Sequence, residues 1–445
     1  MNRKKLISVG LTAAMLTGLL AGCGDSSQNS SQNGSGSEPV VLQWWGSFPE
    51  NMGPNQVCEA FNKIDPNLQV EYTRFVNDDA GNTKLDVSLM SDSSIDVFLS
   101  LNDVLLNKRI DSGYAEPLDE LFDKVGFNIK DDYDDAIEQR QKDGHYYSLP
   151  AKKMTSTILY NKDMFDKAGV TEVPTSLEGI AEVADDLVNK GGAGEALSMG
   201  IYGWFFEEFM CKQGLPYVDN GNGREAAATK VAFDENGGAL NILNEWKKLY
   251  DAGYAPNVGR GGDSGLADFS SGKAAMTLGS TASLKQILQD VNGSFEVGTA
   301  YFPSITDDDK GGVSIGGASL WMLDNQDDAK KAATWEFVKY LVSAESQAYW
   351  NAQTGYFPVT TAAHDEQVFK DNIAKYPQFQ TAIDQLHDSA PEYAGALLSV
   401  FPEARAIVET EIENMLNGKE SAEDAVSKMA SDMNKSIEDY NLLNE

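Results

Sequence analysis

The stretch from residue 40 to residue 75, VVLQWWGSFPENMGPNQVCEAFNKIDPNLQVEYTRF, decides the fold class. Its first six and last eight residues are rich in apolar, β-branched and aromatic side chains, which is typical of strands. Between them Val57, Phe61 and Ile64 recur at helical spacing, on one face of a helix that Pro66 ends. A strand, a helix and a strand in this order predict a β-α-β unit and a parallel sheet.

The same alternation continues along the chain. Further strands are expected at residues 95–101, 155–160, 273–278 and 313–323, and helices at about 176–190 and 238–252. The last 120 or so residues keep apolar side chains at helical spacing almost throughout. The fold class is therefore predicted to be α/β with a helical C-terminal region.

Residues 1–22 have the pattern of a signal peptide. Arg3, Lys4 and Lys5 precede an apolar run that ends at Leu20, which is shorter than a membrane span needs. The run closes in Leu-Ala-Gly-Cys, which resembles the bacterial lipobox, so Cys23 is expected to carry the lipid. The alternative is an ordinary secretory signal with a chance cysteine. Residues 23–38 are Gly, Ser, Gln and Asn with little apolar content and predict a flexible tether.

Anchor and tether together predict a location on the extracytoplasmic face of the cell membrane, with the lipid as the only membrane contact. About 405 residues remain for folding, which exceeds a single core and suggests two lobes. The formal net charge of −33 argues against nucleic acid as a partner, because phosphates would be repelled.

Cysteine and histidine usage argues against metal sites and cofactors. Cys58 and Cys211 lie far apart in sequence, so two separate buried thiols are expected, although a disulfide is an open alternative. The three histidines do not combine with cysteines at zinc-binding spacing. We therefore expect neither a metal nor a cofactor.

The region after residue 330 carries a family resemblance. The segments KKAATWEF (330–337), SAESQAYW (343–350) and TGYFPV (354–359) resemble the helix pair and following loop of family 1 extracellular solute-binding proteins. Three other runs are similar to the glycerol-3-phosphate-binding components of ABC importers. They are NVGR (257–260), IGGASLW (315–321) and FPEARAIV (401–408).

The resemblance implies two α/β lobes, a ligand cleft between them, and an ABC permease as partner of a monomeric binding protein. Lobe 1 would comprise residues 39–152 and 281–325, and lobe 2 residues 153–280 and 326–445. The function implied is capture of a sugar or oligosaccharide for import. The alternative ligand is sn-glycerol 3-phosphate or a glycerophosphodiester.

The tryptophans divide into two groups. Sugars need aromatic plates for their apolar faces and planar polar groups for their hydroxyls. Trp45 ends the first strand, at the carboxyl-end crevice of a parallel sheet, and Trp204 lies at a helix start, so both are expected in the cleft. Trp246 and Trp335 fall in helical periods beside apolar residues and are expected in the core.

The resemblance implies, position by position, site roles for Glu50, Ser280, Gly316, Gly317, Tyr356 and Arg405. Lys153 departs from the family pattern and is included because a lysine there could supply charge for an anion. The full set of expected ligand-binding residues is Trp45, Glu50, Lys153, Trp204, Ser280, Gly316, Gly317, Tyr356 and Arg405. Tyr356 and Arg405 match residues that grip the ligand's polar head, and the two glycines let backbone N–H groups come close. The alternative for Arg405 is a salt bridge with Glu409 on its own helix.

Two departures from the family pattern keep the ligand open. Lys152-Lys153-Met154 replaces a serine-rich stretch, and Ile201 stands where a second tryptophan is expected. Two other functions compete, a glycoside-acting enzyme and a surface glycan adhesin or sensor. The sequence has no nucleophile motif, phosphate loop or metal box, so we expect that the protein is not an enzyme.

Overall fold

The structure is a computed structural model, and residues Pro39–Glu445 form one compact unit. It describes residues 39–445 apart from 49, 51–52, 76–83, 86, 89–94, 101–109, 111–114, 116, 126, 130–140, 143, 324–327, 391–392, 394 and 445. The predicted signal peptide, the lipidation site Cys23 and the predicted tether all lie outside the described residues.

The first sheet has the strand order β2-β1-β3-β11-β6. Its strands are β1 (Val40–Gly46), β2 (Leu68–Arg74), β3 (Val97–Ser100), β6 (Leu149–Met154) and β11 (Gly316–Met322). β1 pairs in parallel with β2 and β3, and β11 pairs antiparallel with β3 and β6. The parallel β-α-β unit predicted from residues 40–75 is confirmed.

Helix α1 (Pro54–Ile64) covers this sheet through one face. Val57 and Phe61 are buried, and the Phe61 ring contacts Phe337 with 5.0 Å between ring centroids. Ile64, which falls on the same face by its spacing, is 66% exposed. Ile64 is the last residue of α1, and the apolar cluster that holds Val57 and Phe61 does not extend to it.

The second sheet has the order β10-β7-β9-β8. Its strands are β7 (Ser156–Asn161), β8 (Glu195–Ser198), β9 (Ala274–Ser280) and β10 (Val297–Tyr301). A single residue, Thr155, separates β6 of the first sheet from β7 of the second, so the chain passes from one sheet to the other without a loop. A small third sheet pairs β4 (Gln141–Lys142) with β5 (His145–Tyr146).

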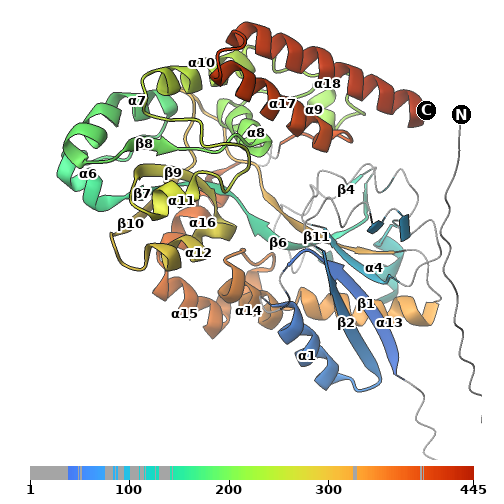
Figure 1. Ribbon diagram of the computed structural model, residues 1–445. Coiled ribbons are helices and arrows are strands. Elements are labelled where there is room, and N and C mark those ends of the chain that lie inside the picture. The colour runs from blue at the N-terminus through green and yellow to red at the C-terminus, as the bar shows by residue number, and fades with distance from the viewer. Residues whose placement is uncertain are drawn as a thin grey trace, which may run out of the picture. The chain divides into compact units, whose positions relative to one another are not determined.

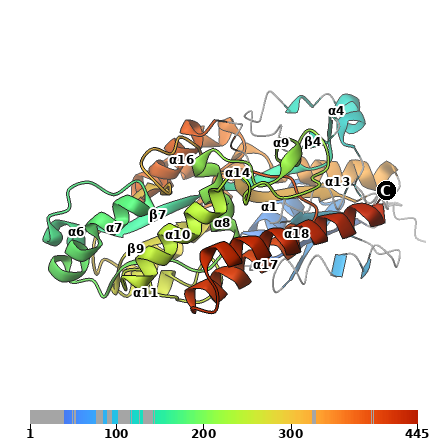
Figure 2. The same cartoon turned by 90° about the horizontal axis from the view of Figure 1, so that it is seen from above.

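Helices cover both large sheets (Figure 1). The other described helices are α4 (Asp119–Val125), α6 (Lys162–Ala168), α7 (Leu177–Asp186), η3 (Leu187–Gly191), α8 (Gly203–Gln213), α9 (Asp219–Gly223), α10 (Gly238–Asp251), α11 (Leu266–Ser270), α12 (Thr281–Val291), α13 (Asp328–Leu341), α14 (Ala344–Thr354), η4 (Thr361–Asp365), α15 (Gln367–Lys375), α16 (Gln378–Asp388), α17 (Phe401–Leu416) and α18 (Ala422–Asn444). Figures 1 and 2 show α17 and α18 side by side, and both pack into the apolar cluster that also contains residues of α8 and α10. The predicted α/β fold with a helical C-terminal region is confirmed.

Strand pairing divides the chain differently from the lobe boundaries expected from sequence. β10, expected in lobe 1, pairs antiparallel with β7 of the second sheet, and α12 packs in the same apolar cluster as β10. Helix α13, expected in lobe 2, buries Trp335 and Phe337 against the first sheet. Its Lys330 also pairs at 2.9 Å with the buried carboxylate of Asp96, just before β3.

The core predictions for individual residues agree with the structure. Trp246 and Trp335 are both almost fully buried, which confirms their assignment to the core. Cys58 and Cys211 are free and buried, so the two-thiol expectation is confirmed and the disulfide alternative is wrong. Among the residues described, no helix has the length and apolar character needed to cross a membrane.

Candidate functional site

Two buried threonines tie the segment that passes from β6 to β7 to the start of α12. The Thr281 backbone N–H donates to the Thr155 carbonyl at 2.9 Å, and the Thr155 N–H donates to the Thr281 hydroxyl at 3.3 Å. Both residues are fully buried. The start of β7 and the end of β9 therefore meet at one point, and the candidate site is built around it.

Three of the expected site residues come together at Met154. The Ser280 hydroxyl lies 3.3 Å from the Met154 sulfur and also caps α12 by accepting from the Ala282 N–H. A Cβ atom added to Gly316 would lie 3.0 Å from the Trp204 ring and 3.1 Å from the Met154 methyl group. The indole and the thioether therefore occupy the space that any side chain at position 316 would need.

Trp204 is 5% exposed and is held at its polar edge. Its indole N–H donates to the Ser314 hydroxyl at 3.3 Å, and Ser314 in turn donates from its hydroxyl and its backbone N–H to Glu208. Burial raises the pKa of Glu208 to about 8, although the two Ser314 donors act in the opposite direction. Sequence reasoning missed Glu208 and Ser314.

Gly317 is required by its neighbours in the sheet. It has a φ of 154°, and an added Cβ would collide with the Lys152 carbonyl oxygen of β6. The close backbone approach that we expected at this glycine is thus made by the neighbouring strand. The β11–β6 pairing shifts register between Ala318 and Ser319, directly after it.

Tyr356 lies in an aromatic cluster around Lys152. The Tyr356 ring meets Phe48, and Phe48 meets Trp350, with centroid separations of 5.5 and 5.3 Å. The Lys152 Nζ lies 3.4 Å from the Phe48 centroid and 3.2 Å from that of Trp350, and the residue is only 4% exposed. This cation–π contact joins β6, the loop after β1 and helix α14.

Lys153 is half-buried and pairs through its backbone with Phe357, at 3.0 and 2.8 Å. The sequence prediction therefore named Lys153, whereas the lysine that the aromatic rings surround is Lys152. Two lysines in a largely apolar strand could have indicated a buried lysine here. The sequence does not distinguish which of these two adjacent lysines, 152 or 153, points inward.

Trp45 and Glu50 lie apart from the residues around Met154. Trp45 is half-buried in a different apolar cluster from Trp204, where its ring packs edge-on against Phe75 with 5.2 Å between centroids. The Lys84 ammonium lies 4.5 Å above the Trp45 ring. Glu50 is exposed. In this structure neither residue has a described contact with Trp204, Ser280 or Gly316, the residues that meet at Met154.

Arg405 is held by an acidic partner on another helix. Its guanidinium donates from Nε and Nη2 to the two carboxylate oxygens of Glu207, at 2.6 and 2.8 Å. The side chains of Arg405 and Glu207 are only 20% and 11% exposed. Burial lowers the pKa of Arg405, but the Glu207 charge outweighs this and keeps the group above its usual range. Glu409, the partner we considered, instead accepts from the Gly203 N–H at 3.0 Å.

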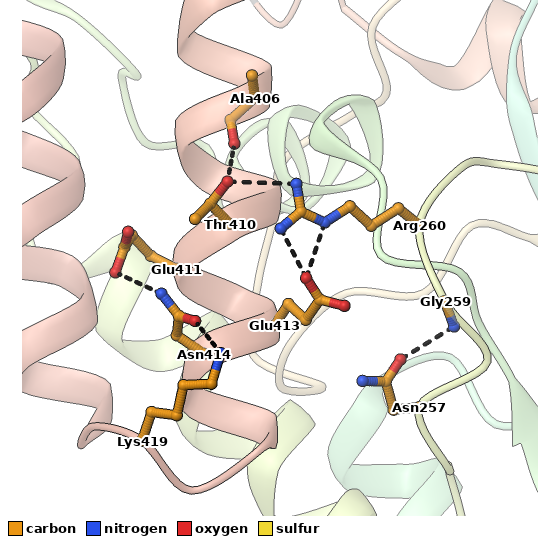
Figure 3. A network of polar contacts seen from close by, with 9 residues as sticks. All are labelled: Asn257, Gly259, Arg260, Ala406, Thr410, Glu411, Glu413, Asn414 and Lys419. Carbon is orange, nitrogen blue, oxygen red and sulfur yellow. Dashed lines mark hydrogen bonds and ion pairs between the residues drawn. The ribbon is translucent and has the colours of Figure 1, made fainter.

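Arg260, from the run NVGR, also contacts α17 (Figure 3). Its guanidinium donates to the Glu413 carboxylate at 3.0 and 2.6 Å and to the Thr410 hydroxyl at 3.2 Å. The Asn257 side chain accepts from the Gly259 N–H at 2.9 Å and so shapes the turn before it. This motif fixes the loop to α17. Within the described ranges, no group of three or more His, Cys, Asp or Glu side chains is placed to hold a metal ion.

Comparison with known proteins supports the fold and identifies the family. The sn-glycerol-3-phosphate-binding periplasmic protein UgpB of Shigella flexneri is 26% identical over 405 residues, which cover 87% of this chain and 90% of that protein. The structure of UgpB from Mycobacterium tuberculosis in complex with glycerophosphocholine matches with a TM-score of 0.76 and 23% identity, over 92% of this chain and all of that chain. The GacH receptor of Streptomyces glaucescens, solved unliganded and with acarbose, matches with a TM-score of 0.74 and 22% identity, over 91% of this chain and all of that chain.

The family model described as bacterial extracellular solute-binding protein matches residues 56–381. This match covers most of both large sheets and the residues around Met154. The chain belongs to the family of bacterial extracellular solute-binding proteins.

Proposed function

We propose that this protein is the substrate-binding component of an ABC importer and that its ligand is a neutral sugar or oligosaccharide. The observation that carries the choice of ligand is the bidentate pair between Arg405 and Glu207. A guanidinium that already binds a carboxylate through two hydrogen bonds is not available to a phosphate unless this pair breaks.

The other groups near the site support the same ligand. The Lys152 ammonium lies between aromatic rings and is almost fully buried, so its charge is also used within the protein. Trp204 and Tyr356 offer ring faces for sugar stacking, and Ser280 offers a hydroxyl. The GacH receptor, a structural relative, was solved with acarbose, which is a saccharide-like ligand.

The second candidate ligand is sn-glycerol 3-phosphate or a glycerophosphodiester. The curated relatives that match 87% of this chain carry names for glycerol-3-phosphate binding. Lys153, half-buried at the end of β6, would supply a cation for the phosphate in this case. Enzymatic activity and a role as a glycan adhesin or sensor have no specific observation in their favour.

We assign the lobes from the sheet pairing. Lobe 1 would comprise residues 39–154 and 316–359, and lobe 2 residues 155–315 and 360–445. Because Trp204 is almost fully buried here, ligand entry requires the crossing segments to bend and expose it. Small-angle scattering should then give a different radius of gyration with and without saturating ligand.

We further propose that the chain is a monomer and that Cys23 carries a lipid that holds it on the outer face of the cytoplasmic membrane. The support is the lipobox-like tetrad ending at Cys23 and the family's extracellular character. Metabolic labelling with a fatty-acid probe should mark the wild type and not Cys23→Ser. Equal labelling of both would contradict the anchor.

A thermal-shift screen tests the ligand class. The panel should contain mono- and oligosaccharides such as maltose and maltotriose, together with sn-glycerol 3-phosphate and glycerophosphocholine. A ligand that binds only the folded state raises the unfolding midpoint, and the rise grows with the logarithm of the ligand concentration relative to its dissociation constant. Stabilisation by a saccharide and not by the phosphates supports the proposal, and the reverse pattern favours the second candidate.

A further inference from the structure

Three polar groups fix the Trp204 indole beside α8, and they form a relay from Trp204 through Ser314 to Glu208. The indole N–H donates to the Ser314 hydroxyl at 3.3 Å, and that hydroxyl donates to one Glu208 oxygen. The other Glu208 oxygen accepts the Ser314 backbone N–H at 3.1 Å. Ser314 thus receives one hydrogen bond from the tryptophan and gives two to the glutamate.

Glu208 is an unusual residue to find at this position. It lies in the middle of α8 and is fully buried, and most side chains around it are apolar. A buried carboxyl group is costly unless it is hydrogen-bonded, and the only hydrogen bonds described for it are those from Ser314. Such a group is expected to have a role besides helix packing.

The relay also sits at the boundary of a crossing segment. Before Ser314, the chain is bound to α8 and to the end of α16. The Gly311 N–H donates to the Lys212 carbonyl at 2.9 Å, and the Val313 N–H donates to the Ser389 hydroxyl at 3.1 Å. After Ser314 come Gly316 and Gly317, where the chain enters β11 of the first sheet. Ser314 is therefore hydrogen-bonded to α8 only two residues before Gly316 and Gly317.

We propose that Glu208 and Ser314 are positioning residues of the ligand site, which orient the Trp204 indole and couple it to the segment that crosses between the sheets. The proposal rests on the proposed function, in which Trp204 stacks on the ligand. Glu208 touches no ligand itself and acts through Ser314. Because the same serine is bound next to the glycine pair, bending of the crossing segment and reorientation of the indole occur together.

The relay can be tested without a ligand by fluorine NMR. The full chain is labelled with 5-fluorotryptophan, and Trp204→Phe assigns the Trp204 resonance. Ser314→Ala and Glu208→Ala should each shift or broaden that resonance, whereas Glu208→Gln, which keeps an acceptor and a donor, should restore most of the wild-type position. Glu195→Gln is the matched control, since Glu195 is another buried carboxylate of the same unit but pairs with Lys273 at 3.0 Å. If the Trp204 resonance keeps the wild-type chemical shift and line width in both alanine variants, the proposal is overturned.

Calorimetry with maltotriose then tests the link to binding. Loss of the hydrogen bond that orients the indole should weaken binding about three- to tenfold in Ser314→Ala, with the enthalpy less favourable. Unchanged affinity in Ser314→Ala beside a strong loss in Trp204→Ala would overturn the positioning role while keeping Trp204 in the site. A wild type that binds none of the saccharides in the panel contradicts the proposed ligand instead, and the fluorine spectra still decide whether the relay positions Trp204.

Discussion

The buried carboxyl group of Glu208 predicts a pH-dependent stability that a single substitution should remove. The ordinary pKa of this group is 4.5, and burial raises it to about 8 in the folded protein. Between these two values the folded state keeps a proton that the unfolded state releases. Because the folded state then binds more protons, the free energy of unfolding falls as pH rises through this window and levels off above pH 8.

The size of the effect follows from the same two values. Each unit of difference between folded and unfolded pKa corresponds to about 1.4 kcal/mol, so the full loss between pH 4.5 and pH 8 is at most about 5 kcal/mol. Glu208→Gln keeps the shape of the side chain and removes the titration. The stability of Glu208→Gln relative to wild type should therefore rise steadily from pH 5 to pH 8.

Urea unfolding at a series of pH values measures this difference directly. Subtracting wild type from variant at each pH removes the contributions of the many other carboxylates. Ser314→Ala provides a check on the sign, since it removes a donor that lowers the pKa of Glu208 and should extend the fall in stability to higher pH than in the wild type. A difference between Glu208→Gln and wild type that stays flat from pH 5 to pH 8.5 would refute the reasoning.

Other expected outcomes follow from the buried ion pair, the thiols and the crossing segments. Arg405→Ala should lower the free energy of unfolding by about 3 kcal/mol in urea titrations, because Glu207 is left buried without its partner, and adding Glu207→Gln should recover part of the loss. The Cys58 and Cys211 thiols should not react with a thiol reagent until the chain unfolds. Burial raises the pKa of Cys58 to about 12 and that of Cys211 well above its usual value. Fast reaction of both thiols in the native state would contradict this prediction. Scattering curves that are identical with and without saturating ligand would exclude hinge bending of the crossing segments.

Strands and helices with a strong period could be predicted from sequence. β1, α1 and β2 follow the alternation and helical spacing of residues 40–75, and their pairing is parallel as expected. The strand β6 was not predicted, because Pro150 and the two lysines at 152 and 153 interrupt its apolar pattern. β8 has only four residues, which is too short for a periodic signal.

The partners of charged residues could not be predicted, because they come from distant parts of the chain. Local spacing suggested Glu409 for Arg405, but the partner is Glu207, which lies 198 residues earlier. Glu207 and Glu208 are adjacent in α8, yet one binds Arg405 and the other Ser314. Since α8 is buried on nearly all sides, its sequence has no polar face that would separate these roles.

The pairing of residues 297–301 and the packing of α13 differ from the expected lobe division for a related reason. The segment after β9 continues as α12 and β10 in the second sheet before the chain returns to β11. Nothing in the local pattern of residues 297–301 says which sheet the strand joins, because five residues of this composition fit the edge of either sheet. The same holds for α13, whose apolar face fits any sheet until its partner is known.

Calorimetric titration of the best-stabilising ligand against four single alanine variants, at low and high salt, tests the central claim most directly. If the ligand is a neutral saccharide, Trp204→Ala should weaken binding most, Trp45→Ala and Lys153→Ala should have little effect, and added salt should hardly change the wild-type affinity. If the ligand is a phosphate gripped by Arg405 and Lys153, both of their variants should lose about one to two decades of affinity and salt should weaken the wild type. That second result would contradict the proposed ligand, and unchanged affinity in all four variants would contradict the placement of the site.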